Sequence, residues 1–186
     1  MNYRRGLTFD PVRNFFLGAD GAEYVECTFE TAKPIMIRVD SDIWAVRFNG
    51  TIQRLDWLQP KLPDPIKEAF RTATAYKLAK AAPSYMAVVY RMLRSLALAW
   101  DKHAPENANG FACLEASHLI ALATNISRHY ASAFRELYRI LAIRGLHDCC
   151  IKKSQVLSEL RLNNLNAGLL PAVRRWDTNR GALTTS

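Results

Sequence analysis

The chain has 186 residues, of which 49% are hydrophobic and 23% charged, a composition typical of a globular protein with one sizeable core or two small domains. No apolar run approaches the roughly 20 residues that span a bilayer, and the first ten residues lack a secretory signal, so we expect a cytoplasmic protein. The net charge of +8 lies entirely in residues 64–186, because residues 1–63 carry eight basic and eight acidic side chains. This basic region favours a polyanionic partner, nucleic acid first and an anionic membrane second; the alternative is a charge excess that only improves solubility.

Residues 1–63 have the period-2 pattern of a small β-rich domain. In EYVECTFE, the residues Val25, Cys27 and Phe29 alternate with mostly polar ones, and PIMIRV follows after a short break. We expect an antiparallel sheet of three or four strands. The proline-punctuated stretch LQPKLPDP is the predicted domain boundary.

A β-hairpin is the strongest local prediction within this region. Asn49-Gly50 separates two strand-like runs, and this pair tolerates the positive φ angles of a two-residue type I′ turn. Such a turn pairs Phe48 with Thr51 and Trp44 with Leu55. One face of the hairpin then carries an apolar strip, made of Trp44, Val46, Phe48, Leu55 and Trp57.

Residues 64–162 have helical periodicity and predict a compact helical bundle, so the fold class is α+β and mainly α. Asp64-Pro65 predicts a helix start with a capping carboxylate and a proline at the first helical position. Pro83-Ser84 begins a second helix. Its apolar residues recur at spacings of three and four, as expected of a core-facing stripe: Met86, Val89, Leu93, Leu96 and Trp100.

Three more helices are predicted toward the end of this region. Residues 111–127 are apolar nearly all round, which predicts a buried helix with His118 as a core histidine. The next helix runs from Arg128 to Gly145, with Tyr130, Phe134, Leu137 and Leu141 as its core stripe. SQVLSELRL predicts a fifth helix capped by Ser154, and residues 163–186 lose periodicity and are predicted to form a linker.

Basic side chains recur on the predicted helix surfaces. Arg128, Ser132, Arg135 and Arg139 share one face, which can lie along a phosphate backbone, and their guanidinium groups can bind phosphate or read guanine. The other candidate DNA-binding residues are Arg91, Arg94, Lys102, Lys77, Lys80, Lys152 and Lys153. An exposed face with three arginines is also common in helices that bind nothing.

Enzyme and metal motifs are poorly represented. Four histidines and four cysteines have no metal-ligand spacing, and no G-x-S-x-G, P-loop or G-x-G-x-x-G motif occurs, so we expect no metal, cofactor or small-molecule substrate. A thiol nucleophile at Cys149 or Cys150, beside His147 and Asp148, is a minor alternative.

The helical part resembles the core-binding domain of tyrosine recombinases, the phage integrase family. The likeness lies in APSYMAVVYRMLRSLALAW, which is similar to that domain's first helix, and YASAFRELYRILAIRGL, which is similar to a later one. It covers roughly residues 64–186, and WDTNRGALTTS is similar to the junction that opens the family's catalytic domain.

This resemblance implies a core-binding (SAM-like) bundle that holds core-site double-stranded DNA during integration and recombination, together with other recombinase subunits and no membrane. The family's His-x-x-Arg motif is absent and no catalytic residue can be carried over, so the chain is expected to lack strand-cutting activity of its own. The small β-rich domain would bind distant DNA sites, pack on the bundle, or contact another subunit. The alternative function is a small helical regulatory or protein-interaction protein.

Overall fold

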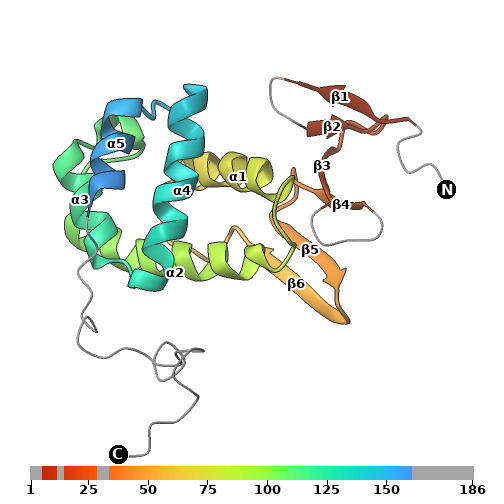
Figure 1. The fold of residues 1–186 in the computed structure, drawn as a ribbon, viewed down its shortest axis with the longest axis horizontal. Helices are drawn as coiled ribbons and strands as arrows, with labels where there is room; N and C mark the ends of the chain where they lie inside the picture. Colours follow the sequence, from red (N-terminus) through yellow and green to blue (C-terminus); the bar gives the residue numbers. More distant parts are fainter. Residues whose placement is uncertain (1–5, 12–14, 29–33, 161–186) are drawn as a thin grey trace, which may run out of the picture.

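The computed structural model describes residues 6–11, 15–28 and 34–160, and these residues form an α+β fold, as predicted (Figure 1). A small antiparallel sheet and a β-hairpin adjoin five α-helices. The predicted linker at 163–186, together with Phe29, lies outside the described residues.

The sheet contains four antiparallel strands in the order β1-β2-β3-β4. Val25 and Cys27 are buried against the helices, as their alternation predicted. The first two strands were not predicted, because three residues are too few to show a period-2 pattern. The strands are β1 (Thr8–Asp10), β2 (Phe15–Leu17), β3 (Glu23–Cys27) and β4 (Ile35–Arg38).

The hairpin of β5 (Ile43–Phe48) and β6 (Thr51–Asp56) has the predicted turn and register. Asn49 and Gly50 have φ angles of 47° and 76°, as a type I′ turn requires. Trp44 pairs with Leu55, and Phe48 with Thr51. Four of the five predicted strip residues are buried, and Val46 is partly buried against them.

Five helices form the rest of the described chain, and α4 lies at their centre, in contact with each of the other four. The predicted core stripe of α2 is fully confirmed, since all five of its residues are buried. Gly145 ends α4 with a left-handed φ of 62°, as predicted. The helices are α1 (Asp64–Leu78), α2 (Tyr85–His103), α3 (Ala116–Asn125), α4 (Arg128–Arg144) and α5 (Ile151–Glu159), with a short 3-10 helix η1 at Phe111–Cys113.

The prediction that residues 111–127 form a buried helix is wrong. Only Leu119, Leu122 and Ala123 of α3 are buried, because α3 covers one side of the bundle and α4 takes the central place. His118 is partly exposed, and its Nδ1 atom accepts a hydrogen bond of 3.2 Å from the backbone N–H of Glu115. His118 is therefore an N-terminal capping residue of α3.

Two predicted helix caps are also displaced. Asp64 is the first residue within α1, and its carboxylate forms an ion pair of 2.7 Å with Lys67 one turn later. Helix α5 begins at Ile151, so Ser154 is buried inside it, and Cys150 with its extended backbone takes the N-cap position. Both helices thus begin earlier than their predicted caps indicate.

One hydrophobic core runs through the hairpin, the sheet and the helices. The Cys27 thiol donates to the carbonyl oxygen of Ala81 at 3.0 Å, which ties β3 to the segment after α1. The Arg71 guanidinium lies 5.6 Å from the centre of the Trp57 ring and bonds Asp42 at 3.2 Å, which ties α1 to the hairpin. The predicted boundary at residue 63 separates strands from helices, while the core continues across it.

Candidate nucleic-acid interface

Three of the ten predicted DNA-binding residues hold helices together. The Lys77 ammonium donates to Glu136 Oε1, and the Arg135 Nη1 group donates to the carbonyl oxygen of Leu160 at 3.0 Å. The Lys153 ammonium donates to the carbonyl oxygen of Leu114. These side chains join α1 to α4, α4 to the end of α5, and α5 to the segment before α3.

Tyr85 reinforces the Lys77–Glu136 contact. Its ring lies 5.5 Å from the Lys77 ammonium, and its hydroxyl donates to Glu136 Oε2 at 3.3 Å. Burial and the neighbouring Glu136 carboxylate raise the pKa of Tyr85, so the hydroxyl stays protonated and remains a donor. Lys77, Tyr85 and Glu136 thus pair with one another, so the Lys77 ammonium already has an anionic partner and is a poor candidate for binding phosphate.

The outward face of α2 carries three of the predicted residues. Arg91, Arg94 and Lys102 fall on one side of this helix at about 100° per residue, and all three are exposed. The backbone N–H of Ser127 donates to the Ser95 hydroxyl at 3.1 Å, which places exposed Arg128, the first residue of α4, beside the middle of α2.

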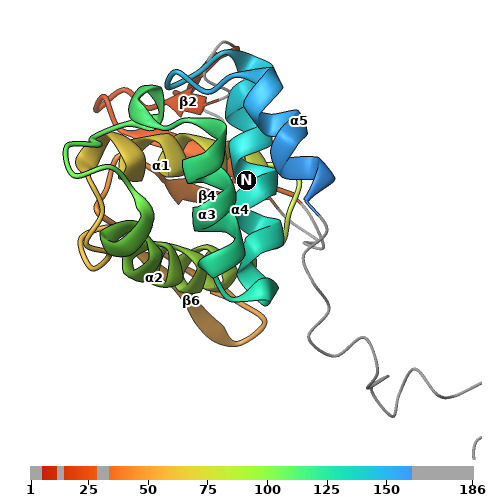
Figure 2. The same ribbon diagram turned by 90° about the vertical axis from the view of Figure 1, so that its left-hand side faces the viewer.

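We name Arg91, Arg94, Lys102 and Arg128 together the basic ridge. None of its four side chains has an ion-pair partner among the described residues. Figures 1 and 2 both show the start of α4 meeting α2 at this place. The ridge thus joins predicted residues from two helices that lie far apart in the sequence.

The hairpin adds a basic side chain that sequence reasoning missed. Strand β6 packs along α2, and between them lies a cavity of about 370 Å³ lined by Arg54, Asp56, Gln59 and Tyr90. The Arg94 guanidinium lies 5.9 Å from the centre of the Tyr90 ring, so the cavity adjoins the basic ridge. Residues 1–63 are neutral overall, and no sequence signal showed that β6 would bring Arg54 to α2.

The remaining predicted residues lie elsewhere on the surface. Arg139 is exposed about 16 Å along α4 from Arg128, with the occupied Arg135 between them. Lys152 is exposed on α5. Lys80 and Lys77 line a separate cavity of about 350 Å³ beside Ser84 at the start of α2. The predicted arginine face of α4 is therefore interrupted.

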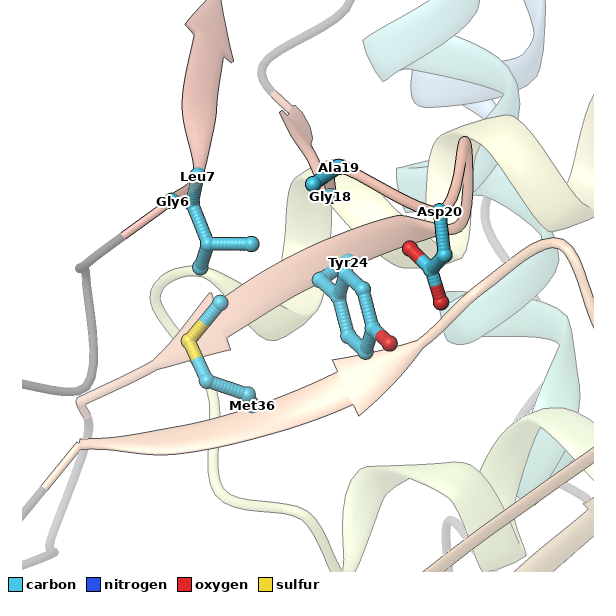
Figure 3. Close-up of a pocket in the computed structure, with 7 residues that line it drawn as sticks. All are labelled: Gly6, Leu7, Gly18, Ala19, Asp20, Tyr24 and Met36. Carbon is cyan, nitrogen blue, oxygen red and sulfur yellow. The ribbon is translucent and has the colours of Figure 1, made fainter.

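A cavity of about 430 Å³ on the open side of the sheet has a different character (Figure 3). Leu7, Tyr24 and Met36 give it apolar walls, and the Asp20 carboxylate accepts a hydrogen bond of 3.1 Å from Ala22. A Cβ atom on Gly18 would lie 2.4 Å from Asp20 Oδ1, so glycine makes room for that carboxylate. With an acidic group and no basic one among its lining residues, this cavity does not suit phosphate.

Cys149 is poorly suited to act as a thiol nucleophile. Cys149 is buried, and burial raises the pKa of its thiol to about 12, which disfavours the nucleophilic thiolate. The nearby His147 ring is hydrogen-bonded to the Thr72 hydroxyl at 3.2 Å. Within the described ranges, no three His, Cys, Asp or Glu side chains are placed to hold a metal ion.

No family model, curated protein or solved structure matches this chain. In the described part of the chain, no helix has the length and apolar character needed to cross a membrane.

Proposed function

We propose that the chain binds double-stranded DNA through the basic ridge, as the DNA-recognition portion of a site-specific tyrosine recombinase. The observation that carries this proposal is that the Ser95–Ser127 hydrogen bond brings the start of α4, with exposed Arg128, to the helix α2 that carries exposed Arg91, Arg94 and Lys102. Strand cutting would require the family's catalytic residues, and the His-x-x-Arg motif does not occur among these 186 residues.

The dimensions of the basic ridge suit a phosphate backbone. Arg91 and Lys102 are 11 residues apart, which is about 16 Å along a helix, or roughly five base-pair steps of 3.4 Å. Arginine can bind phosphate with two parallel hydrogen bonds. Because the ridge arginines have no carboxylate partner, a phosphate does not have to displace one in order to bind. Phosphate contacts would supply most of the affinity and would make binding sensitive to salt.

The finer parts of this proposal come from the family resemblance. They are the core-binding type of the helical bundle and assembly with other recombinase subunits on DNA. A cytoplasmic location is proposed separately, because the sequence has no apolar run of membrane-spanning length and no secretory signal at its first residues. The continuous core favours a sheet that packs on the bundle.

A salt titration of duplex binding tests the proposal. Each of Arg91→Gln, Arg94→Gln and Arg128→Gln should weaken binding and lower the slope of log K against log salt by about one. Lys152→Gln, which removes the same charge from an exposed residue outside the ridge, is the matched control and should change binding less. Absence of binding at about 50 mM salt, or a slope near zero, would overturn the proposal.

A protein-interaction role is the second candidate function, favoured by Leu98. Its side chain is 71% exposed in the middle of the basic ridge, where an apolar group gains nothing from phosphate. This role predicts self-association at micromolar concentration that Leu98→Glu abolishes, together with no duplex binding at about 50 mM salt. Sedimentation velocity distinguishes the two functions.

A further inference from the structure

We infer that the cavity between β6 and α2 binds one unpaired base of a single-stranded nucleic acid, guanine best of all. The inference deepens the proposed function and rests on it, because the basic ridge must hold the phosphates of the same strand. The cavity lies beside the ridge, because Arg94 of the ridge contacts the ring of Tyr90, which lines the cavity.

The cavity offers a flat surface to a base. Tyr90 is partly exposed and forms one wall, and the Arg94 guanidinium lies over its ring at 5.9 Å. A volume of about 370 Å³ accommodates one base with its sugar. Aromatic rings and guanidinium planes are the groups on which proteins stack unpaired bases.

The polar walls of the cavity suit guanine. Asp56 Oδ1 accepts from the backbone N–H of Leu58 at 3.0 Å, and Oδ2 lies 3.4 Å from the Arg54 guanidinium. Each carboxylate oxygen has a second lone pair, so the pair can accept from the adjacent N1–H and N2–H groups of guanine. Arg54 and Gln59 supply donors for the guanine oxygen and ring nitrogen.

The position of the cavity requires an unpaired base. A strand and a helix flank the cavity, which is open to solvent between them. A base within a duplex is stacked on both faces, so only an unpaired base can lay its face against Tyr90. Exposed Arg94 on the ridge side can then hold a phosphate that flanks the inserted base. This arrangement joins sequence-independent backbone contacts to one base-reading pocket.

Binding of 12-nucleotide dT strands, each with one central dG, dA, dC or dT, tests the inference by fluorescence anisotropy at about 100 mM salt. The wild type should bind the dG strand at least threefold more tightly than the other three. Tyr90→Leu should weaken binding of the dG strand by about tenfold. Tyr24→Leu, a partly exposed tyrosine in the other cavity, is the matched control and should bind as the wild type does.

Asp56→Asn tests the guanine assignment, because an amide can no longer accept both guanine donors while its oxygen can still accept from Leu58. This variant should bind all four strands equally, and a circular dichroism melt checks that it folds. RNA strands of the same design distinguish the two kinds of nucleic acid. Equal binding by wild type and Tyr90→Leu overturns the base pocket, and equal binding of the four strands by the wild type overturns the guanine assignment.

Failure of this inference can be told from failure of the proposed function. If the basic ridge does not bind nucleic acid, neither duplex nor single strands bind at about 50 mM salt. If only the pocket is wrong, the wild type binds with a steep salt slope and Tyr90→Leu leaves both affinity and slope unchanged. If both are right, Tyr90→Leu lowers affinity without altering the slope, whereas Arg94→Gln lowers both.

Discussion

Cys149 is buried, and its surroundings disfavour the charged thiolate form. Burial is the main cause of its raised pKa, and exposed Cys113 and Cys150 contrast with it. In the native protein at pH 8, a thiol reagent should therefore label Cys113 and Cys150 at once, and Cys149 with Cys27 only in denaturant. Rapid native labelling of Cys149 in a Cys113→Ser/Cys150→Ser variant would contradict this and would revive a thiol nucleophile.

The raised pKa of the Cys149 thiol predicts that the free energy of unfolding depends on pH. The native Cys149 thiol keeps its proton up to about pH 12, whereas an unperturbed thiol loses it near pH 9. The native state binds more protons between these values, so the Cys149 contribution to the free energy of unfolding is fully present below pH 9 and is lost as pH rises toward 12. Urea titrations from pH 8 to 11 should show a shallower decline for Cys149→Ala than for the wild type.

Gly50 carries a conformational requirement that other residues meet poorly. Its φ of 76° is in the left-handed region, so Gly50→Ala should lower the free energy of unfolding by about 1–2 kcal/mol. Gly110→Ala is the control, because Gly110 has an extended φ of −160° and an added Cβ would meet only Pro65 at 4.0 Å. Equal losses for the two variants in chemical denaturation would rule out the turn as the cause.

At the scale of elements, the packing of helices around α4 determines which basic side chains are paired within the protein and which can bind a ligand. Lys77→Gln and Arg135→Gln should each lower the free energy of unfolding by about 1 kcal/mol, because the first removes the charge that pairs with Glu136 and the second removes the donor to the Leu160 carbonyl oxygen. Neither should change nucleic-acid affinity by more than about twofold. The reverse pattern, normal stability with lost binding, would show that the α4 face contacts the ligand.

The β-hairpin and the helix stripes could be predicted because the information they need is local. Asn49-Gly50 determines the register of the hairpin, and the spacing of apolar residues in α2 determines which face is buried. The contacts of Arg135 and Lys77, and the approach of Arg54 to α2, depend on elements distant in the sequence. The periodicity of a sequence does not show contacts between distant elements. The candidate site could therefore be predicted only in part.

At the scale of the whole molecule, the shared core predicts cooperative unfolding. Trp44 and Trp57 belong to the hairpin but are buried in the same cluster as Phe70 and Phe134 of the helices. In a Trp100→Phe/Trp176→Phe variant, only Trp44 and Trp57 report by fluorescence. Urea transitions of this variant followed by tryptophan fluorescence and by helical circular dichroism should therefore coincide. An earlier fluorescence transition would instead show that residues 1–63 fold as an independent domain.

The central place of α4 has a consequence for how the chain is made. Helices α1 and α2 both need α4 to cover their apolar faces, and α4 ends 80 residues after α1 begins. At roughly 5–20 residues per second, a growing chain leaves the apolar face of α1 uncovered for about 4–16 seconds before α4 is complete, and that of α2 for a shorter time. We therefore expect chaperones to bind the nascent chain during synthesis, even though the finished fold buries both faces.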